Sequence, residues 1–598
     1  MRLTSLLLSF ILCVCMAANG QNLKISTVYD AKVEGGMTFV DMEPSYDGGF
    51  YAAGFSHDTF KFDGSIAPHS YSGGIQVVEN IFLMKFDEYG SEEWVRMIFS
   101  SNANNLEVKY HTMHVDQNGN AHITGEKYKT SKTDSFLFQS SKTKFVGEKD
   151  DGFFIAEYSK KGDLVKTTAL PIYLRLSSPF FKLNTASDTN DNYYISAAFE
   201  HEIEIKNHKF KIPLKGKYTY DPDIVVFKLD DKGKVPWADV YGGFKWEDKI
   251  MSMVYDGNDG LLIMSTTGPR MLFYDQTDSI STRWQKGVVV KYNTTNGKRE
   301  WHTYNEVRNV RGEMAVDKDG NVFMAGLGFQ GLIDIDGKKY GTYDQERHVS
   351  YIAKYNPSGV LKWIVRHDFE EGPNTHKPYA NGYAQINQLK TDVAGNVYAT
   401  GFFRDSLFLE NGKVLYDPEN TSFFTSYNSE GKMLAFDTIK HNIPVRSLVV
   451  PDTGKVMFDF IYYKNMNLRG EPFGISSGSN YSAAILTYGE LCNELELNTF
   501  ASGSHCLGSS ASFKASAASF YPTNFQWYKD GNQLSSGEYL KIDSFSAINA
   551  GSYYVKGTNK CGTGKSKPFS LGFSQPTQEI NHNRQMCVRM IAWPFQFL

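Results

Sequence analysis

Two short segments place oxygen-bearing side chains at alternate positions, as a calcium loop does. The two sets are Asp317-x-Asp319-x-Asn321 and Asp188-x-Asn190-x-Asn192. A complete EF-type loop also needs a bidentate glutamate at its twelfth position, and the first set has Gly328 there. Because Asp, Gly and Asn also form tight turns, the spacing favours turns without an ion. Calcium is therefore a possible cofactor, but we assign no residue of these segments as a metal ligand.

Three histidines, His111, His114 and His122, stand close together and suggest a second possible metal site. In a strand, residues three apart point to opposite faces. One ion could therefore not easily take both His111 and His114, and we expect these histidines to be structural.

Catalytic signatures are sparse. The chain has no Gly-x-Ser-x-Gly elbow, and its many carboxylates cannot be paired by sequence alone. Its 62 basic and 66 acidic residues nearly balance, with no long basic run, so we expect no nucleic-acid partner. We assign no catalytic residue and no cofactor-binding residue.

Aromatic side chains offer surfaces on which a sugar ring could stack. Four tryptophans recur at one position of a repeat, which favours packing over ligand binding: Trp94, Trp237, Trp301 and Trp363. Aromatic residues in variable loops are the better stacking candidates: Tyr218, Tyr220, Phe273, Tyr274, Trp284, Tyr340 and Tyr343.

A repeated element must position all of these residues. A Gly-centred phrase returns at Gly48, Gly119, Asp191, Asp259, Gly320, Gly395 and Gly454, in steps of 71, 72, 68, 61, 75 and 59 residues. A repeat of this length indicates a stacked or radial architecture. Each unit reads as strand, Asp/Gly/Asn turn, strand, variable loop, strand, Asn/Asp-x-x-Gly turn and strand, which predicts a four-stranded antiparallel meander.

Several of these strands are apolar almost throughout, such as 261–264 and 288–290. Strands without alternation have both faces covered, as in radially packed blades. The seventh unit lacks a fourth strand, and the segment 23–29 can supply it. We therefore predict an all-β chain: residues 21–490 form a seven-bladed β-propeller whose ring is closed by the N-terminal strand.

The pattern Asp-x-x-Gly-Asn-x-Tyr-x-Thr-Gly, followed by Phe-x-x-Lys-Tyr-Asp and then Trp, resembles the bacterial β-propeller repeats called SBBP repeats. The resemblance covers roughly residues 22–490. Family members are exported and often carry adhesive modules, so the resemblance implies a cell-surface or extracellular protein.

Residues 491–574 have a different sequence pattern from the repeat. Trp527 before a Lys-Asp-Gly turn and an Ala-Gly-x-Tyr corner at Tyr553 resemble an immunoglobulin-like β-sandwich. Phe513 and Val555 replace the cysteines of antibody domains. Cys506 and Cys561 resemble a disulfide pair of bacterial immunoglobulin-like modules. Pairings with Cys492 or Cys587 stay open, since spacing does not fix connectivity.

The ends of the chain complete the prediction. Residues 1–20 read as a secretory signal, because the apolar stretch 6–18 is too short for a membrane span. Residues 575–598 form a C-terminal tail without a visible sorting domain, so the periplasm is an alternative location. We expect no transmembrane segment in the mature chain.

These observations predict an exported, non-enzymatic binding or adhesion protein. Its propeller would engage an extracellular glycan or protein, and its immunoglobulin-like domain would act as a spacer or second contact. One alternative is a polysaccharide lyase or glycosidase, which requires carboxylates, His and Tyr clustered at one mouth of the channel. A structural envelope protein is the other alternative.

Overall fold

The computed structural model describes residues between 21 and 591. The longer segments left out are 1–20, 30–36, 68–79, 101–106, 129–135, 140–145, 174–182, 212–221, 307–312, 371–383, 474–481, 574–587 and 592–598, together with shorter stretches between strands. The predicted signal peptide and most of the predicted tail lie outside the described residues. The described part of the chain is all-β, and its single helix is a 3-10 turn, η1 (Ala547–Asn549). None of its helices is long and apolar enough to span a membrane.

The chain divides into two compact units. The large unit comprises residues 25–490, and the small unit comprises residues 1–24 and 491–598. Within the small unit, β1 (Gln21–Asn22) pairs with β43 (Cys492–Asn493).

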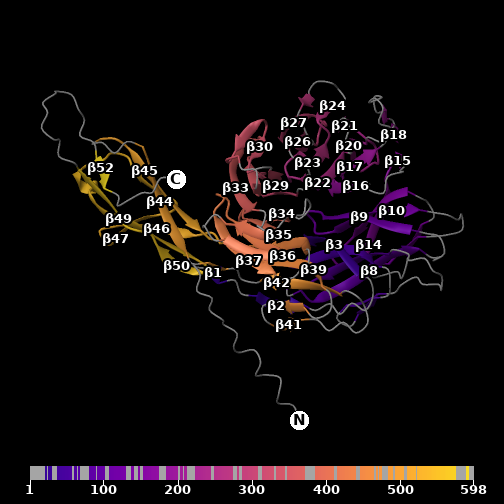
Figure 1. The fold of residues 1–598 in the computed structure, drawn as a ribbon, viewed down its shortest axis with the longest axis horizontal. Coiled ribbons are helices and arrows are strands. Elements are labelled where there is room, and N and C mark those ends of the chain that lie inside the picture. The colour runs from indigo at the N-terminus through magenta and orange to yellow at the C-terminus, as the bar shows by residue number, and fades with distance from the viewer. Residues whose placement is uncertain are drawn as a thin grey trace, which may run out of the picture. The chain divides into compact units, whose positions relative to one another are not determined.

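The large unit contains seven antiparallel four-stranded meanders, here called sheets 1 to 7. A pairing of Asp368 with Phe408 joins sheets 5 and 6 in one hydrogen-bonded sheet. Figure 1 shows the arrangement of the labelled strands. Sheet 1 contains β3 (Met37–Pro44), β4 (Phe50–Ser56), β7 (Asn80–Phe86) and β8 (Glu92–Ser100). Sheet 2 contains β9 (Glu107–Val115), β10 (Ala121–Tyr128), β13 (Gly152–Tyr158) and β14 (Leu164–Ala169). Sheet 3 contains β16 (Leu183–Ser187), β17 (Tyr193–Phe199), β20 (Asp223–Leu229) and β21 (Ala238–Gly242). Sheet 4 contains β22 (Lys249–Tyr255), β23 (Gly260–Thr267), β26 (Lys286–Asn293) and β27 (Arg299–Glu306). Sheet 5 contains β28 (Met314–Val316), β29 (Val322–Gly328), β32 (Arg347–Tyr355) and β33 (Leu361–Glu370). Sheet 6 contains β34 (Ala384–Thr391), β35 (Val397–Phe408), β36 (Val414–Tyr427) and β37 (Met433–Ile439). Sheet 7 contains β38 (Val445–Asp452), β39 (Lys455–Tyr462), β42 (Ser482–Tyr488) and β2 (Ile25–Tyr29).

Shorter strands extend or accompany these meanders. They are β5 (Phe60–Phe62), β6 (Ser65–Ala67), β11 (Phe136–Phe138), β12 (Val146–Glu148), β15 (Ile172–Tyr173), β18 (Glu202–Ile205), β19 (His208–Lys211), β24 (Arg270–Phe273), β25 (Ser279–Ser281), β30 (Ile333–Ile335), β31 (Lys338–Tyr340), β40 (Met466–Leu468) and β41 (Glu471–Phe473). For example, β24 pairs with the outer strand of sheet 3 and β30 with that of sheet 4.

The first strands of the seven sheets contact one another in cyclic order: β3, β9, β16, β22, β28, β34, β38 and again β3. The N-terminal strand β2 pairs antiparallel with β42, with Ile25 opposite Tyr488 and Tyr29 opposite Ile485. This pairing was predicted, and it joins the two ends of the large unit in one sheet (Figure 1).

Apolar cores lie between successive sheets. Tyr51 and Leu83 of sheet 1 pack with Ile123 and Phe154 of sheet 2 in one buried cluster. Corresponding clusters join sheets 2 and 3, 3 and 4, 4 and 5, and 5 and 6. Phe424 of sheet 6 stacks on rings of sheet 7, and a further cluster joins sheets 7 and 1. Each sheet therefore buries both faces, which explains why its strands do not alternate polar and apolar residues.

In four of these sheets a tryptophan forms a hydrogen bond with the next sheet along the chain. The indole nitrogen of Trp301 donates to the carbonyl oxygen of Pro357, 2.9 Å away in the last turn of sheet 5. Gly359 of that turn lies against the indole, so closely that a Cβ there would be 2.7 Å from the ring. Trp94, Trp237 and Trp363 donate in the same way to turns of the following sheets. The expected packing role of these four residues is confirmed.

The small unit is built from two antiparallel sheets. One contains β44 (Glu496–Gly503), β45 (Ala511–Ala518) and β48 (Tyr539–Ile542); the other contains β46 (Asn524–Lys529), β47 (Asn532–Ser536), β49 (Gly551–Asn559), β50 (Gly562–Lys565), β51 (Phe569–Phe573) and β52 (Val588–Ile591). Trp527 and Phe513 are buried in their common core. The hydroxyl of Tyr553 donates to the carbonyl oxygen of Asn549, 2.7 Å away, which is the bond of a tyrosine corner.

Candidate functional site

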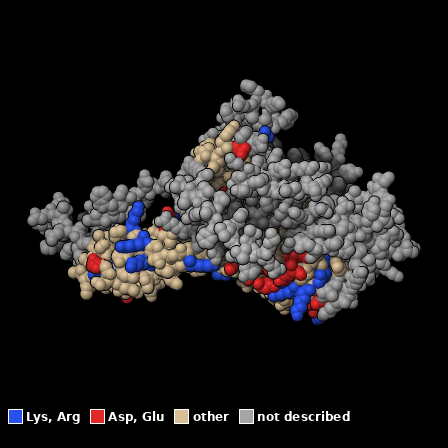
Figure 2. All heavy atoms as spheres, turned by 90° about the horizontal axis from the view of Figure 1, so that it is seen from below, with Lys and Arg blue, Asp and Glu red and all other residues tan. Residues whose placement is uncertain are grey.

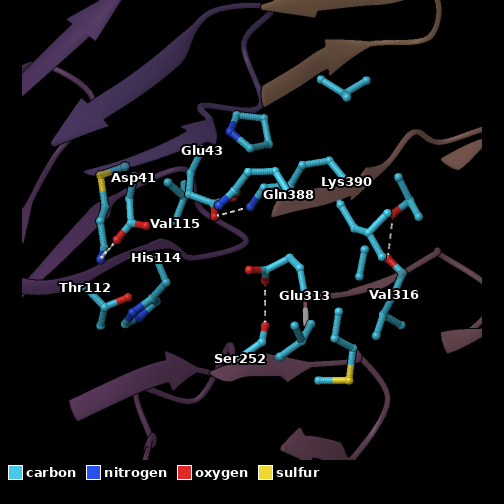
Figure 3. Close-up of a pocket in the computed structure, with 18 of the residues that line it drawn as sticks. Asp41, Glu43, Thr112, His114, Val115, Ser252, Glu313, Val316, Gln388 and Lys390 are labelled. Carbon is cyan, nitrogen blue, oxygen red and sulfur yellow. Dashed lines mark hydrogen bonds and ion pairs between the residues drawn. The ribbon is translucent and has the colours of Figure 1, made fainter. Parts of the chain in front are cut away.

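A cavity of about 980 Å³ lies among the first strands of the large unit. Residues of β3, β9, β16, β22, β28, β34 and β38 all line it, so every one of the seven sheets contributes to its wall. Figure 3 shows side chains of several of these strands converging on it. The order of the strands thus brings together residues that are up to about four hundred positions apart in the sequence.

One ion pair crosses the wall between sheets 1 and 6. Lys390 of β34 lies 2.5 Å from Glu43 of β3, and both side chains are about a quarter exposed (Figure 3). Burial raises the pKa of Glu43 above its ordinary value, although Lys390 opposes the shift. The pKa of Lys390 is also raised, because the attraction to Glu43 outweighs the cost of burial. The pair therefore presents one carboxylate and one ammonium group to the cavity.

Two other carboxylates of the wall are held by neighbouring sheets. Asp41 accepts hydrogen bonds from the Tyr110 hydroxyl at 2.6 Å and from the backbone nitrogen of Met113 at 3.1 Å. Glu313 accepts one from the Ser252 hydroxyl at 2.8 Å (Figure 3). These bonds link β3 to β9 and β22 to the segment before β28, and they fix the orientation of the carboxylates.

His114 adds an imidazole to the same wall. Its Nε2 lies 3.0 Å from the Ser187 hydroxyl, and its Nδ1 lies 3.2 Å from that of Thr185. Burial, and then the neighbouring His122, lower the pKa of His114 well below its ordinary value. His114 is therefore neutral at physiological pH, when each ring nitrogen either donates or accepts one hydrogen bond.

Tyr46 also lines the cavity, from the turn that joins β3 to β4. Its side chain is 62% exposed, and its backbone has a φ of +58°. This left-handed conformation is uncommon for a residue with a bulky side chain, and such strain is concentrated at functional sites. An exposed ring beside a cavity is a surface on which a ligand ring can stack.

Acidic residues outnumber basic ones along the cavity. Eight acidic residues line it: Asp41, Glu43, Asp116, Asp256, Glu313, Asp317, Asp392 and Asp452. Three basic residues do so: Lys318, Lys390 and Arg446. On the outer face shown in Figure 2, acidic and basic side chains of the described residues lie beside one another on the large unit. The cavity is thus suited to a neutral or cationic ligand rather than to a polyanion.

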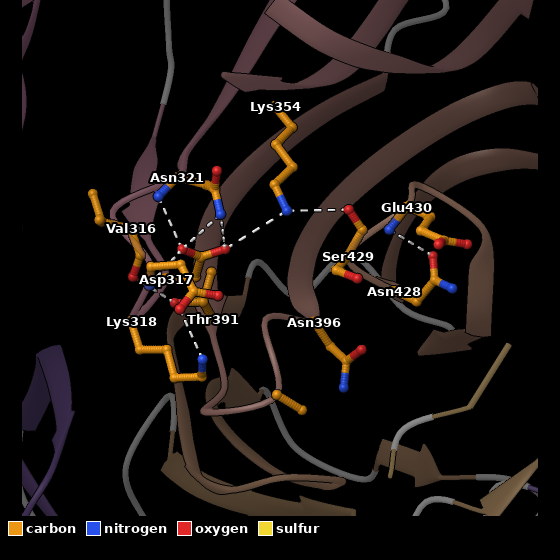
Figure 4. A network of polar contacts seen from close by, with 12 residues as sticks. Val316, Asp317, Lys318, Asn321, Lys354, Thr391, Asn396, Asn428, Ser429 and Glu430 are labelled. Atoms are coloured by element: carbon orange, nitrogen blue, oxygen red, sulfur yellow. Dashed lines mark hydrogen bonds and ion pairs between the residues drawn. The ribbon is translucent and has the colours of Figure 1, made fainter. Parts of the chain in front are cut away.

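The suspected calcium loops are hydrogen-bonded turns. Asp317 accepts from the backbone nitrogens of Asp319 and Asn321 at 3.0 and 2.9 Å, and from the Asn321 amide (Figure 4). Lys354 lies 3.6 Å from the same carboxylate, and the exposed Asp319 pairs with Lys318 instead. The Asp317 oxygens therefore serve the turn.

The turn before β17 is built in the same way. Asp188 accepts from the backbone nitrogens of Asn190 and Asn192 at 2.8 and 3.1 Å. It also accepts from the side chains of Asn192 and Tyr194, at 2.8 and 2.7 Å from its Oδ2. Hydrogen bonds to its charged form outweigh burial and hold the pKa of Asp188 below its ordinary value.

The three histidines separate as the strand geometry predicts, with one addition. His111 contacts the Phe153 ring and lies 3.7 Å from Glu126. His114 stacks on His122 with ring centroids 4.6 Å apart. The sequence did not indicate that His122 meets Asp116 and Glu157, whose ligand-type atoms all lie within 4.8 Å of one another.

The proposed stacking aromatics fare differently. The expectation for Phe273 is wrong: its side chain is fully buried beneath the Arg299 guanidinium, 3.8 Å from its ring centroid. Tyr343 is 59% exposed, whereas Tyr340 is partly buried in β31. Tyr218, Tyr220, Tyr274 and Trp284 lie outside the described residues.

Cys561 lies at the turn that joins β49 to β50. The side chains of Cys492, Cys506 and Cys587 lie outside the described residues. The pairing of Cys506 with Cys561 therefore stays a prediction.

Comparisons with known proteins give no family. No family model matches the chain, and no curated protein matches it. A protein of unknown function from Dyadobacter fermentans is 11% identical in a match covering 65% of this chain and 99% of that one, with a TM-score of 0.30. A DUF4221 member from Bacteroides vulgatus is 9% identical over 65% and 98%, with a TM-score of 0.26. At such scores neither likeness supports a conclusion about this chain.

Proposed function

We propose that the protein is an exported binding protein of the cell surface or extracellular space. Residues 25–490 would form a closed seven-bladed β-propeller, and its central cavity would bind a neutral, polar ligand such as a segment of glycan. Residues 491–574 would be an immunoglobulin-like domain that acts as a spacer or second contact. The resemblance to SBBP repeats favours export, and calcium is kept as a variable in the test.

The cyclic contact of the seven first strands supports the closed propeller. Each sheet packs on its two neighbours, and β2 completes the sheet that begins with β38. Propellers of this kind leave a channel at the centre, bounded by the first strand of each blade. In such a propeller the cavity lined by the seven first strands would be this channel.

The chemistry of the wall supports the choice of a glycan. Amide side chains of Asn184, Gln385 and Gln388 join the carboxylates, hydroxyls and Lys390 around the cavity. Such groups both donate and accept hydrogen bonds, as the hydroxyls of a sugar require. Tyr46 supplies an apolar ring at the edge, and a few polar groups in a concave site are typical of ligand pockets.

The single observation that carries the proposal is this cavity, to whose wall all seven sheets contribute polar and apolar side chains. The test is retention of the purified protein on immobilised polysaccharides and matrix proteins, with and without calcium. Tyr46→Ala should weaken retention about tenfold, which corresponds to about 1.4 kcal/mol. Tyr416→Ala is the matched control, because Tyr416 is 64% exposed and does not line the cavity. Equal retention of both variants would refute the assigned site.

A carbohydrate-cleaving enzyme is the second candidate. Asp41 and Glu43 both line the cavity from β3, and burial raises the pKa of Glu43, as a general acid requires. The ion pair with Lys390 opposes this reading, since it favours the carboxylate form. Assay of the eluates for shortened chains decides: cleavage abolished by Glu43→Gln would replace the binding proposal.

A further inference from the structure

The third strand of several sheets carries a buried lysine that neutralises an aspartate of the preceding turn. Lys291 lies 3.0 Å from Asp256 in sheet 4, and Lys354 lies 3.6 Å from Asp317 in sheet 5. Lys85 lies 2.7 Å from Asp47 in sheet 1. In sheets 4 and 5 a cation thus lies beside a buried carboxylate, whereas Asp47 of sheet 1 is more exposed.

Sheet 2 departs from this arrangement at two facing positions. Sheets 1, 3, 4 and 5 carry a lysine at this position of the third strand, and sheets 6 and 7 carry Ser426 and Thr487. Sheet 2 carries a carboxylate there, Glu157, and the opposite residue on β10 is His122. The residues opposite Lys291 and Lys354 are Leu262 and Phe323. In sheet 2 the aspartate of the turn, Asp116, therefore meets a second carboxylate and an imidazole in place of an ammonium group.

These three side chains form a compact, buried donor set. Asp116, His122 and Glu157 are 8%, 3% and 6% exposed, and their donor atoms lie within 4.8 Å of one another. His122 Nε2 is 3.2 Å from the nearer Asp116 oxygen. Two carboxylates this close repel each other when both are ionised, and a bound cation removes that repulsion.

Neighbouring groups orient the donors. The Tyr193 hydroxyl lies 3.3 Å from His122 Nδ1, and the Asn120 amide donates to Glu157 at 3.1 Å. Outer partners of this kind are typical of metal-binding histidines and carboxylates, because they fix the tautomer and the ring orientation. The partly exposed Lys166 lies 3.4 Å from Glu157 and 3.5 Å from Asp191, so a metal ion would displace this ammonium group from Glu157.

We propose that Asp116, His122 and Glu157 bind one divalent transition-metal cation, for which Zn²⁺ is the probe. One imidazole and two carboxylates form a set that Zn²⁺ accepts, and three protein ligands leave one position open. Asp116 also lines the cavity, which gives the ion a route from solvent. The proposed ion and the ligand proposed for the cavity thus share Asp116, but zinc binding is tested without that ligand.

The test uses the full-length protein without an affinity tag, stripped with a chelator. Zinc binding is measured by competition with a chromophoric chelator and by the rise in Tm on adding zinc. The key variant is Glu157→Lys, which introduces the lysine that sheets 1, 3, 4 and 5 carry at this position and should leave the fold intact. The control is Glu126→Gln, which alters the carboxylate beside His111 in the same sheet.

The wild type and Glu126→Gln should bind one zinc ion each and gain thermal stability from it. Glu157→Lys should bind at least about 100-fold more weakly, since loss of an outer partner alone costs 10–100-fold. If Glu157→Lys does not fold, Glu157→Gln takes its place. Equal binding by the wild type and the Glu157 variant, or no stoichiometric binding by the wild type, would overturn the proposal.

Discussion

The close contact between Gly359 and Trp301 can be tested by measuring the stability of one substitution, Gly359→Ala, against a matched control, Gly320→Ala. Gly359 has a φ of +77°, and a Cβ there would lie 2.7 Å from Cδ2 of Trp301. Gly320 has nearly the same φ, +75°, but the nearest atom to its added Cβ is 3.4 Å away. Gly359→Ala and Gly320→Ala therefore share the backbone cost and differ in the clash.

The expected magnitudes follow from these two terms. An alanine in the left-handed region costs about 1–2 kcal/mol, and this is the whole expected loss for Gly320→Ala. Overpacking adds about 1–3 kcal/mol, or the indole moves and loses its hydrogen bond to Pro357, a loss of about 0.5–1.5 kcal/mol. Gly359→Ala should therefore cost about 1–3 kcal/mol more than Gly320→Ala.

Calorimetry of both variants measures the difference. For a unit as large as residues 25–490, the entropy of unfolding is about 1 kcal/mol/K, so the Tm of Gly359→Ala should lie about 1–3 °C below that of Gly320→Ala. Adding Trp301→Ala to each should remove most of this gap, because the clash requires the ring. Equal Tm values for the two single variants would refute the reasoning that the tryptophans hold adjacent sheets together.

Three further substitutions test buried polar groups. Tyr553→Phe should cost about 0.5–1.5 kcal/mol of unfolding free energy in the small unit, measured by denaturant titration, because its bond to Asn549 is lost. Burial lowers the pKa of His367 from 6.5 to about 4. The contribution of the neutral imidazole to stability is therefore lost as the pH falls from about 6.5 through 4. Unfolding curves of His367→Gln taken across this pH range should lack this loss of stability. Burial raises the pKa of Asp459 from 3.8 to about 6, so stability is lost as the pH rises from about 4 through 6. Asp459→Asn keeps an oxygen that can accept both bonds from Ser447, and it should be more stable than the wild type at pH 7 in unfolding curves.

The sequence predicts the large unit well because its repeat records the parts that pack alike in each sheet. Turn residues such as Asp317 and Gly359 need a particular backbone conformation, and Trp301 needs a carbonyl of the next sheet. These demands recur in most units, so their residues recur at even spacing. The position of β2 followed from the same logic, because one unit lacked a strand.

The cavity residues escaped prediction for the complementary reason. Asp41, Glu43 and Lys390 lie on first strands, which carry no signature of the repeat. Their meeting depends on β3 and β34 lying on the same cavity, hundreds of residues apart in the chain. Phe273 shows the opposite error: it was assigned to an exposed loop but belongs to β24, an added strand that pairs with β21.

Differences among the seven sheets carry more functional information than their likeness. In sheets 4 and 5 a lysine, Lys291 or Lys354, lies beside the buried aspartate of the turn. In sheet 6 the corresponding Asp392 accepts hydrogen bonds from Asn396 and Tyr398 instead. Sheet 2 differs in bringing a second buried carboxylate, Glu157, near the aspartate of its turn, with the partly exposed Lys166 beside it. Tyr46 likewise adopts a strained conformation that other residues of its kind avoid. Both departures lie in sheets 1 and 2, so we expect the functional part of this ring of similar sheets to be on that side of the cavity.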